Sequence, residues 1–308
     1  MEQRNRLSVQ WLNGMVTHSP AELVTLSERM YNRQIDRTAD EIAAKRGERS
    51  ILLVSGPSAS TKTTTAMKLA DRLARRSVRA VVISLDDFFI NRRDLPLLPN
   101  GDKDFESIRT MDLDTLNRCF REVLRDGWSD FPIYDFPSGC RSAETRRISI
   151  DQDTIVIMEG IHALNPEIVR EQNPGSFFKL YISPNSDYYE EDELILSARD
   201  VRLIRRIVRD FFHRGNTAEN TMRMWVNVVA SEKVNILPYK TEADFIIDST
   251  ILYEPNIYEY WLDRILDRST AGEAHAGKLA ELSRALSRFV ELKNEFVPAD
   301  TVLHEFLE

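Results

Sequence analysis

Short, mostly apolar runs recur along the chain and are separated by longer polar or amphipathic segments. Runs that lack the alternation of a half-exposed strand are typical of a parallel sheet covered on both faces. The runs that fit are 51–55, 80–84, 154–158, 178–182 and 245–247. Helical segments fall between them, so we predict an α/β fold with a doubly wound, mostly parallel sheet.

The stretch before the first run has the spacing of a helix. Residues 21–46 contain neither glycine nor proline, and their apolar residues recur at roughly helical spacing. These residues are Leu23, Leu26, Met30, Ile35 and Ile42. Ser19 and Pro20 precede them and form a typical helix start. Further helices are predicted at 62–75, 112–125, 197–213, 217–234 and 257–294, with a polar loop over 85–103.

A phosphate-binding pattern lies between the first run and the helix that follows it. Residues 56–63 nearly match G-x-x-x-x-G-K-[ST]. In such a loop, main-chain N–H groups and the helix N-terminus hold phosphate oxygens. We expect Lys62 to reach the β- and γ-phosphates of ATP and the Thr63 hydroxyl to bind Mg²⁺. The expected ATP-binding residues are Gly56, Pro57, Ser58, Ala59, Ser60, Thr61, Lys62, Thr63 and Thr64.

Thr61 stands where the pattern has its second glycine. A β-branched residue resists positive φ, and we expect its Cβ to come close to the phosphates and to weaken or rearrange nucleotide binding. The alternative is an ordinary strand-to-helix turn rich in Ser and Thr, which are common helix caps. The strand before, the helix after, and Lys62 and Thr63 in register favour the nucleotide site.

Acidic residues follow two of the predicted strands. Asp86 and Asp87 come after the run 80–84, and Glu159 comes after the run 154–158. Ligands of open α/β sheets bind at the carboxyl ends of the strands. Asp86 would orient an acceptor hydroxyl and take its proton, and Glu159 would serve the metal with Thr63. Taken singly, each acid could instead be a helix cap or a surface charge.

The segment 202–214 is rich in arginine. Four arginines, at positions i, i+3, i+4 and i+7, share one face of the predicted helix. They are Arg202, Arg205, Arg206 and Arg209, and Arg214 extends the set. A mobile helix could close this face over ATP as a lid and neutralise charge on the transferred phosphoryl group. We name Arg205 and Arg206 first as catalytic, with Arg202 and Arg209 as ATP-binding.

The alternatives for these arginines are a solvated face or a nucleic-acid patch. A solvated face would pair with Asp200, Asp210 or the acid-rich run 187–193. The net charge of -8 argues against nucleic acid as a partner.

Composition narrows the cellular setting. The two cysteines, Cys119 and Cys140, form no Cys-x-x-Cys pair, so we expect neither a zinc site nor a disulfide framework. No run is long and apolar enough for a membrane span, and the N-terminus has no secretory pattern. We therefore expect a cytoplasmic protein without a membrane partner.

The motifs together resemble the uridine kinase and phosphoribulokinase group of P-loop kinases, and more closely the bacterial uridine kinase-like nucleoside kinases. The resemblance covers roughly residues 25–308. The matching segments are GPSASTKTTT, ISLDDFF, DFESIRTMD, FPIYDFPSGCR, IVIMEGIHALNP, RLIRRIVRDFFHRG and VPADTVLHEF. Their order and spacing are more specific than any one segment.

The resemblance implies roles for individual residues. Asp86 would be the general base toward a nucleoside 5′-hydroxyl, Glu106 would hold the ribose hydroxyls, and Tyr134 would lie against the base. Glu159 would serve the metal, the arginines of 202–209 would act from the lid, and Asn220 matches a glutamine that follows the lid. The full set of expected acceptor-site residues is Asp86, Phe89, Glu106, Tyr134, Arg141, Arg205 and Asn220.

One departure from the family pattern concerns the base. Pyrimidine nucleoside kinases of the group place a histidine five residues after the tyrosine, and here that residue is Gly139. Loss of a hydrogen-bonding group could broaden or change the base preference. We predict an Mg-ATP-dependent kinase that phosphorylates the 5′-hydroxyl of a nucleoside, with uridine and cytidine as the favoured acceptors.

Two alternatives stay open. The acceptor could be another hydroxyl compound, such as a sugar, a sugar phosphate or pantothenate. Basic residues for a sugar phosphate are available in Arg92, Arg93, Lys103 and Arg141. The chain could also be a nucleotide sensor without turnover, which Thr61 and Gly139 would favour and the retained Lys62, Thr63, Asp86 and Glu159 oppose.

We divide the chain into three segments. Residues 1–48 form a helical lead-in, 49–252 form the kinase core with lid helices at about 197–235, and 253–308 form a helical C-terminal extension. The C-terminal helices could cover the core or a second subunit of a homo-oligomer, and the sequence does not decide between them.

Overall fold

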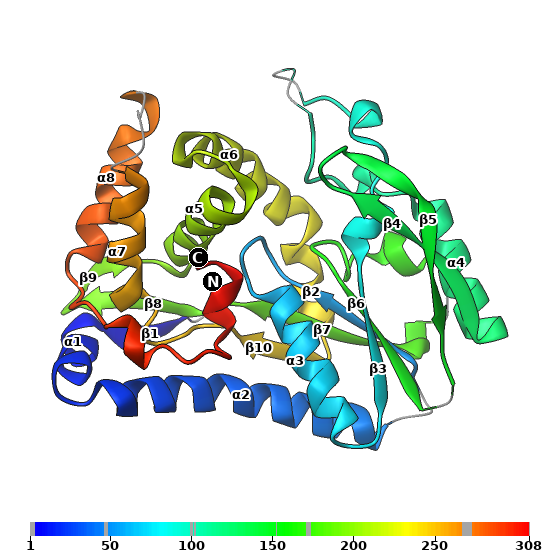
Figure 1. Cartoon of the computed structure of the whole chain (residues 1–308), viewed down its shortest axis with the longest axis horizontal. Helices are drawn as coiled ribbons and strands as arrows, with labels where there is room; N and C mark the ends of the chain where they lie inside the picture. The colour runs from blue at the N-terminus through cyan, green and yellow to red at the C-terminus, as the bar shows by residue number, and fades with distance from the viewer. Residues whose placement is uncertain are drawn as a thin grey trace.

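A five-stranded sheet forms the centre of the molecule in the computed structural model, which describes residues 4–45, 49–98, 101, 103–151, 153–170, 174–266 and 273–307. All neighbouring strands of this sheet run parallel. Its order is β10 (Phe245–Asp248), β7 (Phe177–Ser183), β2 (Ile51–Ser55), β6 (Thr154–Glu159) and β3 (Arg79–Ser84). The five apolar runs of the sequence are these five strands, which confirms the predicted parallel sheet (Figure 1).

Helices cover both faces of the sheet. The helices α2 (Pro20–Ala44) and α3 (Lys62–Ala74) lie on one side, and α4 (Leu113–Asp126) lies on the other. Leu52 and Val54 belong to the apolar cluster of the first side, while Ile51 and Leu53 belong to the cluster of the second. Successive side chains of a strand point to opposite faces, so a strand buried on both sides must be apolar throughout. The doubly wound arrangement is thereby confirmed.

Four further helices pack together near the β7 and β10 side of the sheet. They are α5 (Ala198–Arg214), α6 (Ala218–Asn235), α7 (Pro255–Leu266) and α8 (Glu273–Leu286). α5 contacts α6 and α7, and α7 contacts α8 (Figure 1). One apolar cluster includes residues from Val9 to Leu307, so the C-terminal helices cover the core of their own chain. No helix among the described residues could cross a membrane.

The predicted helix over 257–294 is wrong at its end. After α8, the chain turns over 287–289, runs without regular structure over 290–293, and then forms short 3₁₀ turns at Asn294–Phe296 and Val302–Glu305. The irregular part has hydrogen-bond partners elsewhere: Leu292 donates its N–H to the Asn256 carbonyl at 2.8 Å, and the Val290 carbonyl accepts from the Asn256 side chain at 2.8 Å. The last residues lie in the middle of the molecule, between α3 and α5 (Figure 1).

Several elements were not predicted. They are the antiparallel hairpin of β4 (Trp128–Asp135) and β5 (Cys140–Ser149), the small sheet of β1 (Asn5–Ser8), β8 (Ser186–Glu190) and β9 (Glu193–Leu196), and the helix α1 (Val9–His18). β5 is exposed along most of its length, so it carries no apolar pattern. β8 and β9 contain most of the acid-rich run 187–193, for which the sequence analysis gave no strand.

That acid-rich run has partners outside α5. Arg4 donates to Asp187 at 2.9 Å, and Arg6 donates to Asp192 at 3.2 Å. Glu190 forms an ion pair with Arg288. The suggested pairing of this run with the arginines of 202–209 is not found among these contacts. Arg6 of β1 and Arg4, which precedes β1, lie beside β8 instead.

Candidate functional site

The candidate site is assembled at the carboxyl edge of the parallel sheet. Glu159, the last residue of β6, lies in register with Val54 of β2 on one side and Ser84 of β3 on the other. The phosphate loop follows β2, and Asp86 lies in a 3₁₀ turn, Leu85–Phe88, directly after β3. The structure therefore brings the loop and the two acids of the sequence prediction to one place.

The phosphate loop turns sharply between β2 and α3. A Cβ on Gly56 would lie 2.1 Å from the Ile182 carbonyl oxygen, so only glycine fits there. Ala59 and Thr61 have positive φ angles of 59° and 68°, and α3 begins at Lys62. The Lys62 amine donates to the Pro57 carbonyl at 3.0 Å, within the loop. This path is that of a main-chain concavity next to a helix N-terminus, which suits an anion.

The side chain of Thr61 points away from the concavity. It is 0% exposed, and its hydroxyl donates to the Ser60 carbonyl at 2.6 Å and lies 3.2 Å from the Oγ1 of Thr65. The expectation that this Cβ approaches the phosphates is therefore wrong. Thr61 does adopt the left-handed conformation of the glycine that it replaces, with its side chain directed into the interior toward α2.

Two carboxyl groups, one amine and one hydroxyl meet above β6. The Thr63 hydroxyl donates to Glu159 Oε1 at 3.2 Å. Burial raises the pKa of Glu159 to about 7, and the nearby Asp86 adds to the rise. Burial also raises the pKa of Asp86, against the effect of Lys62, and it lowers the pKa of Lys62, against the effect of Glu159. Buried like charges of this kind favour a cation between them.

This oxygen set suits Mg²⁺. Magnesium prefers one or two carboxylates together with substrate phosphates and water, and a P-loop threonine hydroxyl is a common ligand. Thr63 and Glu159 are already within hydrogen-bond distance of each other, so a single ion could contact both. The residues present therefore fit the metal that the sequence predicts.

Arg205 braces the loop from the interior. It is 0% exposed, and its Nε and Nη2 donate to the two carboxylate oxygens of Glu254 at 2.7 and 2.8 Å. It also donates to the main-chain carbonyl of Ala59 at 3.3 Å. A guanidinium paired in this way has no exposed surface to offer a phosphate, so the expected direct catalytic and acceptor contacts of Arg205 do not fit its position. Nothing in the sequence marks Glu254 as its partner.

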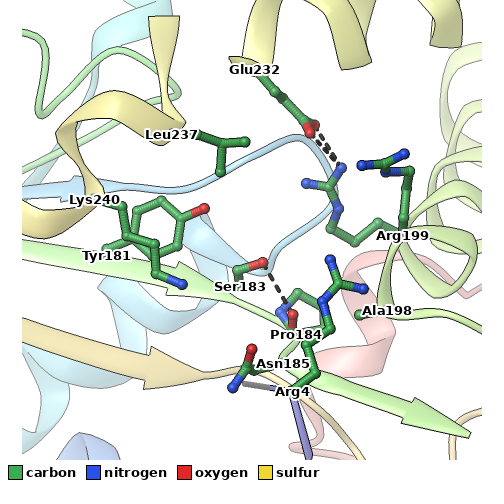
Figure 2. A pocket seen from close by; sticks show the side chains of 11 residues that line it. Arg4, Tyr181, Ser183, Pro184, Asn185, Ala198, Arg199, Glu232, Leu237 and Lys240 are labelled. Atoms are coloured by element: carbon green, nitrogen blue, oxygen red, sulfur yellow. Dashed lines mark hydrogen bonds and ion pairs between the residues drawn. The ribbon is translucent and has the colours of Figure 1, made fainter. Parts of the chain in front are cut away.

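Arg202 lies one turn before Arg205 in α5 and pairs with a carboxylate of α6. Its Nη2 donates to both carboxylate oxygens of Glu232, at 2.6 and 2.9 Å. Both residues line a pocket of about 70 Å³ at the carboxyl end of β7, together with Arg4, Tyr181 and Lys240. Figure 2 shows Glu232 and these last three residues around the pocket. None of the residues that line this pocket belongs to the phosphate loop. The position does not fit the expected ATP contact of Arg202.

Arg206 contacts a side chain of the phosphate loop, whereas Arg205 contacts the loop's main chain. The Nη1 of Arg206 donates to the Ser58 hydroxyl at 2.9 Å and lies 3.9 Å from Glu106 Oε1. Its Nε is 3.3 Å from Asp210, a carboxylate that is 1% exposed. Asp210 also pairs with Arg209 at 2.9 Å and with Arg214 at 3.6 Å. Among the described contacts, Asp210 therefore pairs with three of the arginines, Arg206, Arg209 and Arg214. Asp210 is one of the acids that the sequence analysis named as possible partners.

The side of the site where we expect the acceptor is aromatic. Tyr134 of β4 is 8% exposed and packs edge-on against Phe89 and Phe136, with ring centroids 5.9 and 5.2 Å away. Asp87 accepts a hydrogen bond from the Tyr134 N–H at 3.2 Å, which connects the hairpin to the turn that carries Asp86.

A carboxyl group lies on the same side of the site. Burial raises the pKa of Glu106, against the effect of Arg206. Phe89, Tyr134 and Glu106 thus lie on elements that border Asp86 and the arginine face.

Two other expected acceptor residues are engaged elsewhere. Arg141 donates to Asp112 at 2.8 Å and to the carbonyls of Phe88 and Phe89 at 3.4 and 3.5 Å, so it supports the loop that carries Phe89. Asn220 lies in the first turn of α6, donates to Asn216 at 2.9 Å and accepts from Arg223 at 3.0 Å.

The place beside Gly139 is filled by an arginine. Gly139 has a φ of 69°, and a Cβ built on it would lie 2.7 Å from Arg92 Nε. Arg92 also donates its N–H to the Gly139 carbonyl at 2.7 Å and its Nη2 to the Phe136 carbonyl at 2.8 Å. No side chain fits at position 139 while Arg92 is in this place. The guanidinium of Arg92 therefore lies beside the position where the family pattern has a histidine.

The C-terminal turn supplies a residue that sequence analysis missed. Glu305 accepts a hydrogen bond from the Thr64 hydroxyl at 2.6 Å, and its charge acts on Lys62. The Leu307 carbonyl is 2.8 Å from His213 Nε2 of α5, which anchors the same turn. Glu305 and Thr64 are 241 positions apart, and no local pattern could have related them.

Comparison with known proteins gives the following similarities. The model of the Phosphoribulokinase / Uridine kinase family matches residues 51–252. The chain is 28% identical over 203 residues to a uridine kinase of Halalkalibacterium halodurans, covering 65% of this chain and 87% of that protein. It is 27% identical to a uridine kinase of Geobacillus kaustophilus, with the same coverage of 65% and 87%. A solved structure described as a possible uridine kinase from Bacillus stearothermophilus aligns with a TM-score of 0.48 at 18% identity, covering 70% of this chain and 98% of that one.

Proposed function

The chain belongs to the Phosphoribulokinase / Uridine kinase family and is a phosphotransferase with a hydroxyl acceptor. We propose that it transfers the γ-phosphoryl group of ATP to the 5′-hydroxyl of a nucleoside. Uridine and cytidine are the favoured acceptors. The observation that carries the proposal is the meeting of Lys62, Thr63, Asp86 and Glu159 at one edge of the sheet. Donor, metal and base are the groups that phosphoryl transfer to a hydroxyl requires.

The donor phosphates would lie on the main-chain N–H groups of residues 56–64. Lys62, now bonded to the Pro57 carbonyl, would turn to the β- and γ-phosphates. Arg206 is bonded to Ser58 of the same loop, and Arg209 acts electrostatically on both Lys62 and Asp86. We therefore assign Arg206 and Arg209 to the transferred phosphoryl group, and a bracing role to Arg202 and Arg205 in place of the expected contacts.

Asp86 would orient the acceptor hydroxyl and take its proton. A general base works best when its pKa lies near the working pH, and burial raises the pKa of Asp86 in that direction. Lys62 and the α5 arginines Arg214 and Arg209 act against the rise. Bound Mg²⁺, held by Thr63 and Glu159, would supply charge neutralisation at the phosphates.

The acceptor would lie between the turn after β3 and the β4–β5 hairpin. Tyr134 and Phe89 offer aromatic surface for a planar base, and Glu106 offers a carboxylate for ribose hydroxyls. Arg92 beside Gly139 would face the far edge of the acceptor as a donor of two hydrogen bonds.

The position of Arg92 also favours a second candidate, an acceptor that carries a phosphate or carboxylate. Guanidinium groups bind these anions with paired hydrogen bonds. A sugar phosphate would satisfy Arg92 as well as a pyrimidine edge would, and Asp86 would serve either hydroxyl in the same way.

A coupled ADP-release assay separates these acceptors. Uridine, cytidine, adenosine, guanosine, ribose and ribulose 5-phosphate would be compared at equal ATP and Mg²⁺ concentrations. The proposal predicts the largest kcat/KM for uridine or cytidine. A larger value for ribulose 5-phosphate would replace it with the second candidate, and no ADP release with any acceptor would favour a nucleotide sensor.

A further inference from the structure

A group of hydroxyls lies beneath the phosphate loop and links it to α2. Tyr31 of α2 is 1% exposed, and Thr61 and Thr65 are each 0% exposed. The Tyr31 hydroxyl is hydrogen-bonded to the Oγ1 of Thr65 and lies 3.4 Å from the Oγ1 of Thr61. The three hydroxyls are shielded from water, so they must find their partners in one another or in the loop.

The number of protons fixes the direction of these hydrogen bonds. The Thr61 hydroxyl donates to the Ser60 carbonyl at 2.6 Å, and the Thr65 hydroxyl donates to the Thr61 carbonyl at 2.5 Å. A threonine hydroxyl has one proton to donate, so the bond between Tyr31 and Thr65 uses the proton of Tyr31. Burial raises the pKa of Tyr31 to about 12, which keeps that proton bound at neutral pH.

The loop residue above these hydroxyls has a backbone conformation that needs support. Thr61 has a φ of 68° and a ψ of 26°, the left-handed region. β-Branched residues rarely adopt it, and they keep it only where surrounding contacts impose it. Two hydrogen bonds supply these contacts: the Ser60 carbonyl accepts from the Thr61 hydroxyl, and the Thr61 carbonyl accepts from the Thr65 hydroxyl. The two carbonyls lie on either side of the Thr61 nitrogen and α-carbon, so the bonds restrain the backbone of Thr61.

We propose that Tyr31 is a positioning residue for the ATP site. Its hydroxyl acts through Thr65 to hold the backbone of Thr61 in the left-handed conformation. This conformation directs the N–H groups at the start of α3 toward the phosphates. The inference rests on the proposed kinase function, because it presumes that the loop binds ATP. Tyr31 lies outside residues 51–252, the span that the family model matches.

The helix that carries Tyr31 is fixed relative to the loop. Arg72 of α3 lies 3.1 Å from Asp36 of α2, and Arg76 of α3 lies 2.7 Å from Asp40 of α2. These pairs join the two helices beyond the hydroxyl group. Ile35 of α2 and Leu69 of α3 are also fully buried in one apolar cluster. This packing, more than the part-exposed ion pairs, holds the Tyr31 hydroxyl in place, as a positioning residue requires.

A double-mutant cycle tests the inference. Glycine adopts the left-handed conformation without support, so Thr61→Gly should make the Tyr31 hydroxyl unnecessary for the loop. ATP affinity would be measured by calorimetry in the full chain for the wild type, Tyr31→Phe, Thr61→Gly and the double variant, with KM for the acceptor as a second readout. Tyr31→Phe should weaken ATP binding about fivefold, the equivalent of about 1 kcal/mol for one hydrogen bond. When Thr61→Gly is already present, the same change should weaken binding less than about twofold, and KM for the acceptor should not change.

A matched control removes a buried tyrosine hydroxyl that is bonded outside the loop. Tyr188 is 0% exposed and donates to the Ile251 carbonyl at 3.4 Å. Tyr188→Phe should change the melting temperature but not ATP affinity. If Tyr31→Phe does not fold, Thr65→Val breaks the same connection and carries the same prediction with and without Thr61→Gly.

The outcomes separate the inference from the function on which it rests. An equal loss of ATP affinity with and without Thr61→Gly, or no loss in either case, would overturn the positioning role while leaving the kinase function intact. A wild-type chain that binds no ATP would overturn the proposed function itself.

Discussion

The span that the family model matches and the segments that flank it contribute different things to the phosphate loop. The matched span, 51–252, supplies Lys62, Asp86 and Glu159, which line the edge where substrates would bind. The flanks supply Tyr31 below the loop and Glu305 at Thr64. The groups that we propose for the chemistry thus lie in the shared part of the chain, and part of the support for the phosphate loop lies outside it.

The two groups also differ in how their charges are satisfied. Glu159 is buried and Asp86 is half-buried, and the two carboxyl groups act on each other with raised pKa values, a state that costs stability until a cation binds. Glu254, just beyond the matched span, is fully neutralised by Arg205. Changes in the matched site should therefore alter turnover or pH dependence, while changes in the flanks should alter stability or affinity.

The largest effect on the free energy of unfolding is expected at the buried ion pair between Glu254, in the C-terminal flank, and Arg205 of α5. Glu254→Ala leaves the guanidinium of Arg205 buried without its partner, and removing one member of such a pair costs about 3–5 kcal/mol. Urea unfolding measures the loss. Asp192→Asn, at an exposed pair with Arg6, is the matched control and should cost less than about 1 kcal/mol. Equal losses at the two sites would contradict the distinction between interior support and surface charge.

The next effect concerns Glu159 and pH. Its pKa in the folded chain, about 7, lies above the ordinary value of 4.5, so between these two the folded state binds more protons than the unfolded state. The free energy of unfolding should therefore fall as pH rises from about 4.5 to about 7, by up to about 3 kcal/mol at 1.36 kcal/mol for each pKa unit. Glu159→Gln should remove much of this fall.

Denaturant titrations from pH 5 to pH 8 without nucleotide provide the measurement. Added Mg-ATP should flatten the wild-type profile, because it favours the ionised carboxylate. A wild-type profile no steeper than that of Glu159→Gln would show that this carboxyl group is not held protonated by the fold.

The smallest effect is expected at the C-terminal flank. Glu305 presents a negative charge at Thr64, where we expect ATP phosphates, so Glu305→Gln should tighten ATP binding about threefold to fivefold, or about 1 kcal/mol. Asp300→Asn removes the same charge from an exposed position of the same segment and should have no effect. Tighter binding in both variants would indicate a general charge effect in place of a local one.

Sequence reasoning recovers the elements whose burial is uniform. Runs such as 51–55 and 154–158 are apolar because both faces of the sheet are covered, and the acids at their ends follow from the topology of a parallel sheet. The hairpin of β4 and β5 escapes it because β5 is largely exposed and has no apolar alternation.

The sequence does not show which carboxylate pairs with each arginine of α5. The spacing of Arg202, Arg205 and Arg206 places them near one helix face, yet their carboxylate partners lie in α6, after β10 and within α5 itself. A buried charge finds its counter-charge through tertiary packing, which local pattern does not specify. The same reason hides the contact of Tyr31 with a loop about 30 positions away.

Asp86 allows the most direct test of the account. Phosphoryl transfer and ATP binding would be measured separately for the wild type and Asp86→Asn with the best acceptor of the ADP-release panel. The account predicts that turnover falls by about 10² to 10⁴ while ATP affinity changes by less than about threefold. Turnover by Asp86→Asn at the wild-type rate would contradict the proposal that this carboxylate takes the proton of the acceptor hydroxyl.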